Sequence, residues 1–503
     1  MSDNLFAALI AGKPLDALAL IPAWDAPVSY GELIARSGRF AHFLVARGVR
    51  PGDRIAVQVE KSLNALLLYL AALRVGAVYL PLNTGYTAAE IGYFVGDAEP
   101  WLLIVDPAAE AMAAGFVGTS VGAFATLSAD GTHGSVIDGS AGLPADFTDV
   151  LRRADDLAAI LYTSGTTGRS KGAMLTHGNL HSNAATLVET WRFGASDELL
   201  HALPIYHTHG LFVATNVALL AGASIRLLPR FEPDAVLRGL ATATVMMGVP
   251  TFYTRLLADP RLDRAAVERV RLFVSGSAPL LAETHGAWAQ ATGHRILERY
   301  GMTETNMNSS NPYDGERRPG TVGPALPGVA IRVVDEATRA PLPSGEIGMI
   351  EVKGPNVFAG YWRMPDKTAA ELKEDGFFIT GDLGRLSDDG YLEIVGRGKD
   401  LVITGGLNVY PKEVETEIDA LDGVEESAVI GVPHPDFGEA VMAVVVRARD
   451  STIGQAEILD AIALRLARFK LPKAIVFVDD LPRNAMGKVQ KNIIRESVER
   501  GER

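Results

Sequence analysis

A stretch rich in glycine, hydroxyl side chains and lysine lies at residues 162–173, with the sequence Tyr-Thr-Ser-Gly-Thr-Thr-Gly-Arg-Ser-Lys-Gly-Ala. Glycines allow tight turns in which several backbone N–H groups approach one anion, and hydroxyl groups and a lysine ammonium add further donors. These residue types favour a phosphate-binding loop, although their spacing is not G-x-x-x-x-G-K-[ST], and a plain surface turn is the alternative. The candidate phosphate contacts are Thr163, Ser164, Gly165, Thr166, Thr167, Gly168 and Lys171.

A second polar cluster lies at residues 296–305, where the sequence reads Ile-Leu-Glu-Arg-Tyr-Gly-Met-Thr-Glu-Thr. Its last carboxylate, Glu304, is a hard oxygen donor of the kind that Mg²⁺ prefers. An exposed carboxylate at a helix start is the alternative for this residue taken alone. His207 and His209 form a His-x-His pair, but no third ligand follows at a convincing spacing. The pair therefore favours histidines in a pocket wall or in the core.

Alternating strand and helix patterns must position these residues. Apolar runs at 54–59, 77–82 and 101–105 predict buried strands, and the segments 64–75 and 88–97 between them predict helices. Such alternation is typical of α/β proteins with a parallel sheet.

The phosphate-loop stretch follows an apolar run at 157–161, which predicts a strand, and precedes a predicted helix from Asn179 onward. A strand over the segment that begins at Leu199 places His207 at its carboxyl end, where ligand sites of open α/β sheets gather. Residues 118–149 are rich in small and polar residues, and we predict an irregular segment there.

The composition changes near residue 313, where Pro- and Gly-rich loops alternate with short β-patterned runs. A polar, glycine-flanked break at 397–400 separates this part from a C-terminal segment that predicts a compact α+β unit of normal domain size. The predicted fold class is therefore α/β, with a large N-terminal domain of parallel-sheet layers, a small β subdomain and a small C-terminal α+β domain.

The overall composition is that of an ordinary globular protein. The chain has 503 residues, 48% of them hydrophobic, a formal net charge of −13 and no cysteine. The negative charge argues against nucleic-acid binding, and the missing cysteines exclude disulfides and fit a reducing compartment. The N-terminus has no basic segment before an apolar core, and the apolar run 65–82 is interrupted by Arg74, Gly76 and Pro81. We therefore predict a cytoplasmic protein that is not inserted into a membrane.

These stretches, taken in order, resemble the adenylate-forming superfamily of acyl-CoA synthetases, luciferases and nonribosomal-peptide adenylation domains. The resemblance covers nearly the whole chain and includes the stretches 162–173, 300–305, 380–384 and 481–491. It implies a reaction in which a carboxylate attacks the α-phosphate of ATP, giving an acyl-adenylate and pyrophosphate, before the thiol of coenzyme A displaces AMP.

The resemblance also implies nucleotide contacts. Glu304 corresponds to the Mg²⁺ carboxylate, and Thr303 lies beside the α-phosphate. Tyr300 corresponds to the aromatic residue that stacks on adenine. Asp382 accepts hydrogen bonds from both ribose hydroxyls, which requires two acceptor oxygens, and Arg397 is a second ribose or phosphate contact unless it is a solvated surface arginine. Further nucleotide-pocket residues in this assignment are Ser277, Ala278, Pro279, Glu298 and Arg299.

In the C-terminal part, Lys488 resembles the family's lysine that bridges the reacting carboxylate and the α-phosphate. Lys399 falls at the family's hinge, so that the implied parts are a domain at 1–396 (β-rich over 313–396), a hinge at 397–400 and a mobile domain at 401–503. Gly405 and Gly406 resemble the loop that lines the coenzyme A passage in the second step.

Arg299 departs from the small residue that relatives often carry before Tyr-Gly, at the floor of the family's acyl pocket. Because an unpaired buried charge is costly, an arginine there suits an acid with a second carboxylate, which it can hold bidentately. Arg255 and His207 are further candidate donors, and salt bridges to Glu298 or another acid are the alternative for both arginines. The other residues in this predicted acid pocket are Gly301 and Met302.

Among these families, the chain most resembles malonyl/methylmalonyl-CoA synthetases, whose Glu-Arg-Tyr-Gly-Met-Thr-Glu-Thr string appears at 298–305. The resemblance therefore implies a short dicarboxylate, ATP, Mg²⁺ and coenzyme A as ligands. A stand-alone adenylation module that loads a carrier protein, a synthetase for another short acid, and a non-catalytic nucleotide-binding relative are the alternatives. No carrier domain is recognisable in the chain, and Thr303, Glu304, Asp382 and Lys488 occur together, so the first and third are disfavoured.

Overall fold

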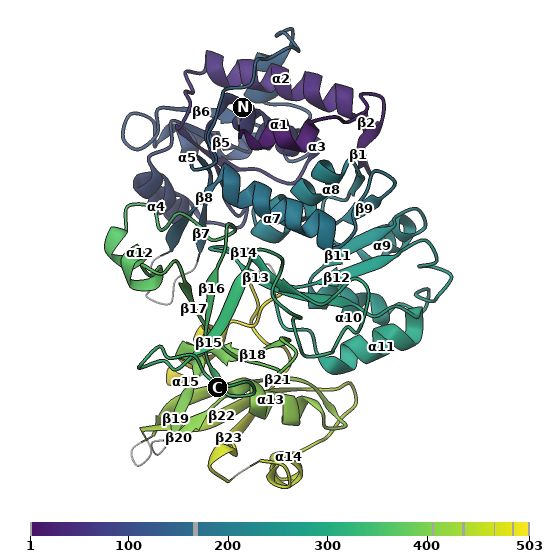
Figure 1. Ribbon diagram of the computed structural model, residues 1–503, viewed down its shortest axis with the longest axis vertical. Coiled ribbons are helices and arrows are strands. Elements are labelled where there is room, and N and C mark those ends of the chain that lie inside the picture. Colours follow the sequence, from purple (N-terminus) through teal and green to yellow (C-terminus); the bar gives the residue numbers. More distant parts are fainter. Residues whose placement is uncertain are drawn as a thin grey trace.

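The computed structural model describes residues 3–163, 170–404, 407–434, 438–466, 468–484 and 487–500. Within these ranges the chain forms sheets of eight, six, five and four strands, and Figure 1 shows helices packed between and around the two largest. The predicted class, a large α/β domain with parallel sheets joined to a small C-terminal α+β domain, is confirmed.

The six-stranded sheet has the order β6-β5-β3-β4-β7-β8 and is parallel except for β8. Its strands are β3 (Arg54–Gln58), β4 (Val78–Pro81), β5 (Leu102–Val105), β6 (Ala123–Thr126), β7 (Leu157–Thr163) and β8 (Lys171–Thr176).

One local prediction in this sheet is wrong, and one strand was not predicted. The segment 118–149 contributes β6 and the helix α6 (Ser135–Ser140) instead of being irregular throughout. The helix predicted from Asn179 onward is confirmed as α7 (His177–Thr190), but the strand β8, which precedes it and pairs antiparallel with β7, was not predicted. The strands β6 and β8 are short. Pairing of β6 with β5 and of β8 with β7 stabilises them, and this is a tertiary effect that local propensity does not report.

The eight-stranded sheet has the order β14-β13-β12-β11-β9-β10-β1-β2, and its edge strands β2 and β14 are antiparallel to their neighbours. Its strands are β1 (Leu18–Pro22), β2 (Val28–Ser29), β9 (Glu198–His201), β10 (Ser224–Leu227), β11 (Val245–Gly248), β12 (Leu272–Ser275), β13 (Leu297–Met302) and β14 (Asn306–Ser310). Because β9, β11, β12 and β13 are parallel, their carboxyl ends share one edge of the sheet.

Helices α3 (Leu63–Val75), α7 and α8 (Asn216–Ala221) lie between the two large sheets (Figure 1). α3 is buried on nearly all sides, with Ser62 as its N-terminal cap. Tyr69 of α3 donates a hydrogen bond to Asn216 at the start of α8 (3.2 Å). The other helices of this part are α1 (Leu5–Ile10), α2 (Tyr30–Ala46), α4 (Ala88–Ala98), α5 (Glu110–Ala114), α9 (Pro233–Leu240), α10 (Pro250–Leu257), α11 (Ala282–Thr292) and α12 (Pro365–Glu371), with short turns at Pro107–Ala109 and a π-helix at His209–Thr215.

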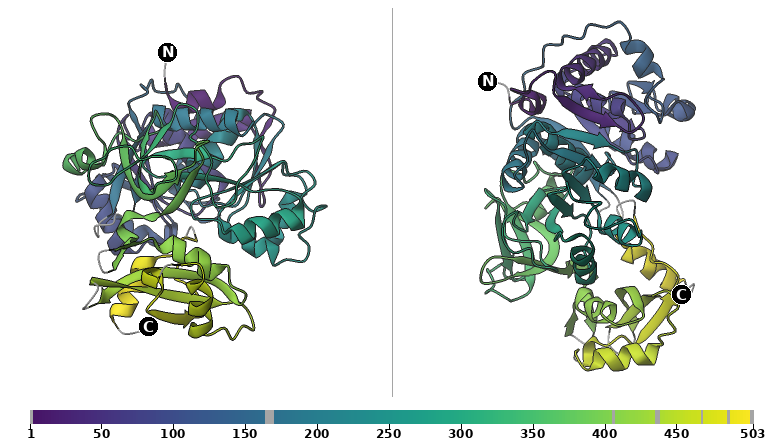
Figure 2. Two further views of the ribbon diagram at one scale, coloured as in Figure 1. Left: turned by 60° about the horizontal axis from the view of Figure 1, so that its bottom comes forward. Right: turned by 90° about the vertical axis from the view of Figure 1, so that its right-hand side faces the viewer.

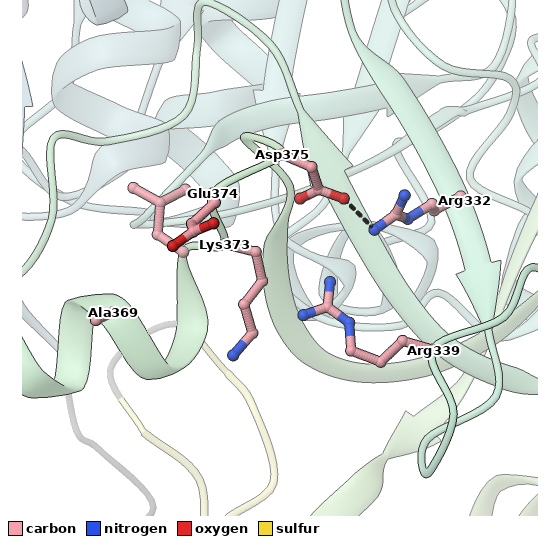
Figure 3. A pocket seen from close by; sticks show the side chains of 7 residues that line it. Arg332, Arg339, Ala369, Lys373, Glu374 and Asp375 are labelled. Carbon is pink, nitrogen blue, oxygen red and sulfur yellow. Dashed lines mark hydrogen bonds and ion pairs between the residues drawn. The ribbon is translucent and has the colours of Figure 1, made fainter.

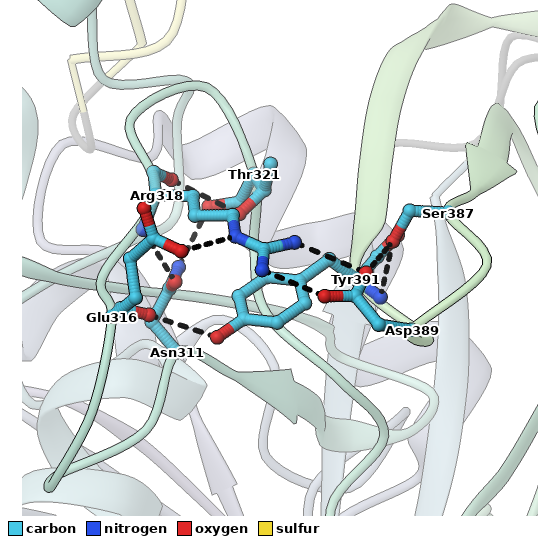
Figure 4. Close-up of polar contacts among 7 residues, drawn as sticks. All are labelled: Asn311, Glu316, Arg318, Thr321, Ser387, Asp389 and Tyr391. Atoms are coloured by element: carbon cyan, nitrogen blue, oxygen red, sulfur yellow. Dashed lines mark hydrogen bonds and ion pairs between the residues drawn. The ribbon is translucent and has the colours of Figure 1, made fainter.

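The four-stranded sheet is an antiparallel meander, and it is anchored to the large domain by a polar network (Figure 4). Arg318 lies 3.8 Å from the ring centre of Tyr391 and makes paired hydrogen bonds to Asp389 (3.0 and 2.6 Å). Its backbone N–H donates to Asn311, next to the edge strand β14. The strands are β15 (Ala330–Val334), β16 (Gly348–Lys353), β17 (Phe378–Leu386) and β18 (Leu392–Arg397).

The five-stranded sheet forms a separate C-terminal unit, seen at the bottom of both views in Figure 2. A short 3₁₀ turn, Gly398–Asp400, connects β18 to it. Its elements are β19 (Val402–Thr404), β20 (Leu407–Val409), β21 (Val424–His434), β22 (Gly438–Arg447), β23 (Ala474–Val478), α13 (Pro411–Asp419), α14 (Gln455–Ala463), α15 (Lys491–Glu499) and a turn at Arg468–Lys470. The predicted domain limits stay predictions. None of the helices in the described ranges has the length and apolarity needed to span a bilayer.

Candidate functional site

The predicted site residues come from separate elements that meet between the eight-stranded sheet, the four-stranded sheet and the C-terminal unit. Three groups of side chains can be distinguished, and each is named here by one member. The Asp382 cluster is Tyr300, Asp382 and Arg397; the Glu304 cluster is Lys171, Glu304, Tyr361 and Glu371; the Arg299 cluster is His207, His209, Ser277 and Arg299.

The Asp382 cluster joins β13 to the hairpin β17–β18. Tyr300 donates a hydrogen bond to one oxygen of Asp382 (2.6 Å), and Arg397 pairs with the other (2.9 Å). All three lie on strands, so their positions are set by the sheets. The carboxylate of Asp382 raises the pKa of Arg397, which therefore stays protonated. Charge and hydrogen-bond partners are thus matched within this cluster.

Lys488 approaches the Asp382 cluster from the C-terminal unit. Burial and the charge of Arg397 together lower the pKa of Lys488 to about 8, against the opposing effect of Asp382 and Asp400. Asn484 caps the turn that carries the lysine, because its side chain accepts from the Lys488 N–H (3.0 Å).

The turn that carries Lys488 also touches the large domain. Gly487 lies so close to Thr251, at the start of α10, that a Cβ on Gly487 would stand 3.0 Å from the threonine hydroxyl.

The Glu304 cluster lies in the interior around Lys171, near the C-terminal end of the phosphate-loop stretch. The hydroxyl of Tyr361 lies 3.0 Å from Glu304 and 2.6 Å from Glu371, and it can donate its one proton to either carboxylate. Lys171 lies 3.5 Å from Glu371 and 4.2 Å from the ring centre of Tyr361. Burial raises the pKa of Glu304. Glu304 is therefore a buried carboxylate, and the exposed helix-start alternative is wrong because the turn after β13 folds it inward.

The Arg299 cluster differs from the other two because its cation has no anionic partner among the residues that the structure describes. Arg299 is 4% exposed, and its Nε and Nη2 atoms make no hydrogen bond within the described part of the chain. Burial lowers the pKa of Arg299 to about 9, so the guanidinium is charged at neutral pH. The salt bridge to Glu298 does not form: successive strand residues point to opposite faces, and Glu298 faces His285 instead (3.5 Å).

Two histidines line the same cluster in their neutral form. Burial, followed by the charge of Arg299, lowers the pKa of His207 to about 4 and that of His209 well below its usual value. The His209 ring lies 3.2 Å from the Ser277 hydroxyl, and its backbone N–H donates to the His207 ring (3.3 Å). His207 lies in the loop beyond β9 and not at the strand end, because β9 stops at His201.

Several predicted contacts lie apart from these clusters or outside the described residues. Arg255 is on the exposed face of α10, with its guanidinium 5.6 Å from the ring centre of Phe231, outside the Arg299 cluster. Ala278 and Pro279 follow Ser277 after β12, and Thr303 follows Gly301 and Met302 in the turn after β13. The predicted contacts that lie outside the described residues are Ser164, Gly165, Thr166, Thr167, Gly168, Gly405 and Gly406.

Sequence reasoning missed Tyr361 and Glu371, which complete the Glu304 cluster. Tyr361 belongs to a Gly-Tyr-Trp string in a loop-rich region and Glu371 ends the short helix α12, so neither has a spacing that points to Glu304. Lys171 and Glu371 are far apart in the sequence and are brought together only by the tertiary fold. A single sequence therefore carries no signal for their pairing.

A surface hollow also lies at the four-stranded sheet (Figure 3), and it shares no residue with the three clusters. Its arginines are neutralised: Arg332 pairs with Asp375 (2.8 Å) and with the buried Glu351 (2.7 Å), and Arg339 pairs with Glu351 as well (2.7 Å). The charges in this hollow therefore serve the local structure, and no function is assigned to it.

Comparison with known proteins identifies the family. The AMP-binding enzyme family matches residues 6–362, and the AMP-binding enzyme C-terminal domain matches residues 413–488. The chain belongs to the AMP-binding enzyme family. The three clusters lie within these matches or, for Glu371, Asp382 and Arg397, in the segment between them.

Individual members of the family are similar over most of the chain. The crystal structure of ATP-bound MatB from Rhodopseudomonas palustris is 60% identical, covers 100% of both chains and superposes with a TM-score of 0.97. A malonate–CoA ligase from Arabidopsis thaliana is 38% identical over 69% of this chain and 62% of its own. A mitochondrial malonate–CoA ligase from Mus musculus is 32% identical over 97% of this chain and 90% of its own.

Proposed function

We infer that this AMP-binding enzyme is an AMP-forming acyl-CoA synthetase that joins malonate or methylmalonate to coenzyme A through an acyl-adenylate. The observation that carries the choice of acid is the buried guanidinium of Arg299, which has no anionic partner within the described residues. A second carboxylate on the substrate would supply that partner. Two malonate–CoA ligases among the similar proteins support the same substrate.

The first step requires groups that stabilise charge around the α-phosphate. The ammonium of Lys488 would bridge the attacking carboxylate and the α-phosphate and reduce their repulsion, which is largest in a site with little water. Lys171 and the hydroxyl-rich stretch before it would hold the departing pyrophosphate. Asp382 offers acceptors to the ribose hydroxyls, and Tyr300 offers its ring to adenine, with Thr303 beside the α-phosphate.

Glu304 fits a Mg²⁺ ion that is shared with the phosphates. Its carboxylate is buried, lies 3.0 Å from the Tyr361 hydroxyl and forms no ion pair within the described residues. Hard oxygen ligands of this kind, together with phosphate oxygens and water, are what Mg²⁺ prefers. When bound, the ion would neutralise charge on the phosphates, while Tyr361 would keep the carboxylate oriented.

The second step requires Lys488 to leave so that the thiol can reach the adenylate. The segment 397–400 would act as the hinge, since it is a short turn between two sheets. Asp400 forms an ion pair with Arg495 of α15 (2.7 Å), so the end of this turn belongs to the C-terminal unit. We expect Lys399→Pro, which restricts φ, to keep adenylation and lose thioester formation. Normal overall turnover would place the hinge elsewhere.

The function is tested by mixing the purified protein with ATP, Mg²⁺, coenzyme A and a panel of acids, and by measuring AMP release and the thioester formed. We expect malonate and methylmalonate to be used far better than acetate, propionate or butyrate. Equal use of butyrate and malonate would contradict the dicarboxylate. Adenylate formation without transfer to free coenzyme A would favour loading of a carrier protein. Omission of Mg²⁺ should abolish the first step. A cytoplasmic location stays a prediction from composition.

A further inference from the structure

Lys61 is a buried lysine in the loop between β3 and α3, far in sequence from the three clusters. It is 6% exposed, and its ammonium contacts three acceptors: the ring Nδ1 of His201 (2.9 Å), the carbonyl of His201 (2.8 Å) and the carbonyl of Leu203 (2.8 Å). Three acceptors match the three N–H bonds of an ammonium. Lys61 therefore links the six-stranded sheet to the end of β9 in the eight-stranded sheet.

These contacts determine which nitrogen of His201 carries the proton. The Nδ1 atom accepts from Lys61, so the hydrogen is on Nε2, which donates to the carbonyl of Gly210 (2.9 Å). Thr215 donates its hydroxyl to the same carbonyl (3.0 Å). Burial, with the charge of Lys61, lowers the pKa of His201 well below its usual value, so the ring is neutral.

The chain from Lys61 to Gly210 spans the loop that carries His207. The loop begins beyond His201 and runs into the π-helix at His209, and it is folded so tightly that a Cβ on Gly210 would lie 1.9 Å from the carbonyl oxygen of Pro204. π-helical turns are rare and often occur at functional sites. The side chains of His201 and Thr215 hold this turn at its start.

Burial lowers the pKa of Lys61 well below its ordinary value. Its three acceptors nevertheless require three N–H donors, which only the ammonium form has, so Lys61 adds charge to the interior. Within the described residues no carboxylate pairs with Lys61, and the same holds for Arg299. Two buried cations are thus unmatched by acids within the described residues: Lys61, which contacts His201, and Arg299, whose charge acts on His207 and His209. A dianionic substrate would be attracted by both cations, and a monoanion would leave more positive charge uncompensated.

We propose that Lys61 is a positioning residue for the acid substrate: through His201 and the Gly210 carbonyl it holds His207 and His209 against Arg299, and its charge favours a dicarboxylate. The proposal rests on the proposed function, because it concerns the same acid pocket. It assigns Lys61 no contact with ATP, which would bind at the Asp382 and Glu304 clusters.

The test replaces Lys61 by methionine, which keeps an unbranched side chain but removes the donors and the charge. We expect the KM for malonate to rise about tenfold or more, as for loss of a buried charged hydrogen-bonding group. The KM for ATP should change less than about twofold, and the preference for malonate over propionate should fall. Lys13→Met is the matched control, because Lys13 donates to a backbone carbonyl, that of Leu220 (2.6 Å), away from the acid pocket; it should change neither KM.

A second pair of variants covers the case in which Lys61→Met does not fold. Thr215→Val keeps the shape but removes one donor to Gly210, and Thr215→Ser restores it. We expect the valine variant to raise the KM for malonate about threefold or more and the serine variant to behave as the unmutated protein.

A uniform loss for all acids with an unchanged malonate-to-propionate ratio would overturn the proposal, because a purely structural lysine would act in that way. A rise in the KM for ATP equal to that for the acid would overturn it as well. Failure of the proposed function looks different: the unmutated protein itself would not use malonate. The effects of the variants on the KM for the acid and on the KM for ATP would then be compared with the acid that the protein does use.

Discussion

The two ends of the candidate site differ in how their charges are matched. At the nucleotide end, Arg397 is paired with Asp382, and Lys171 faces Glu371. At the acid end, Arg299 and Lys61 have no acidic partner within the described residues. Burying a charge without a partner is costly, so the acid end is arranged for an anion that the protein does not itself contain.

The difference separates two strategies of recognition. At the nucleotide end, internal ion pairs fix the side chains before ATP arrives, and ligand binding need only add hydrogen bonds to groups that are already ordered. At the acid end, the substrate completes the charge balance, so acids that lack the second carboxylate leave a buried cation unpaired. Selectivity should therefore depend on the acid end, and the rate of adenylation on groups at the nucleotide end.

The largest expected effect concerns Lys488, which we propose to contact both the carboxylate of the acid and the α-phosphate of ATP. Lys488→Ala should lower the rate of malonate-dependent pyrophosphate exchange by about 10²- to 10³-fold, because it removes one preorganised charge from the reacting centre. Thioester formation from supplied acyl-adenylate should be nearly unchanged. Lys470→Ala, which breaks an ion pair with Glu413 within the C-terminal unit, is the control. Equal losses in both half-reactions would contradict the role of Lys488.

A selective effect is expected for Arg299. Arg299→Ala should lower kcat/KM for malonate by about one to two decades, because the second carboxylate loses its bidentate partner. The loss for propionate should be much smaller, so that the preference narrows or reverses. Arg255→Ala is the paired control, and a selective loss confined to that variant or to His207→Ala would move the carboxylate contact there. Measurement requires kcat/KM for both acids with each variant.

Much of this organisation could be predicted from the sequence, because it depends on local strings. The alternation of apolar runs predicted the α/β class, and the strings at 162–173 and 298–305 pointed to phosphate and carboxylate chemistry. Their chemistry is carried by residue types that lie close together in the chain, and such signals need no knowledge of tertiary contacts.

The remaining features depend on contacts between distant segments. Whether Arg299 is unpaired could not be known before β13 placed Glu298 on the opposite face. Lys61 and Tyr361 lie outside the motifs, and their partners are set by how two sheets pack. β6 was missed because its short Ala-Phe-Ala-Thr run gives a weak periodic signal, whereas pairing with β5 stabilises it.

A smaller effect is expected from pH, again at the nucleotide end. Lys488 acts as an ammonium, and its pKa in the protein is about 8, below the ordinary value for lysine. As pH rises through this value the charged form is lost, so kcat/KM for adenylation should fall about tenfold per pH unit above it. Activity at pH 6 to 7 should be full with respect to this group. In Lys488→Arg any remaining activity should lack this decline, since arginine stays protonated. An unchanged alkaline limb in that variant would assign the decline to another group.

The smallest effect tests the geometry of the acid end without removing a charge. A Cβ on Gly276 would lie 2.3 Å from the Cζ atom of Arg299 and 2.5 Å from its Nε, so Gly276→Ala must displace the guanidinium. Gly276 does not have a positive φ angle, so alanine adds no backbone strain at this position. Because the arginine can move at its flexible end, we expect the KM for malonate to rise about three- to tenfold, with the KM for ATP unchanged. Gly286→Ala on α11, where a Cβ would meet nothing within 4 Å, is the matched control. If Gly276→Ala bound malonate as tightly as the unmutated protein, the position of the guanidinium would not matter, and recognition at the acid end would depend on net charge alone.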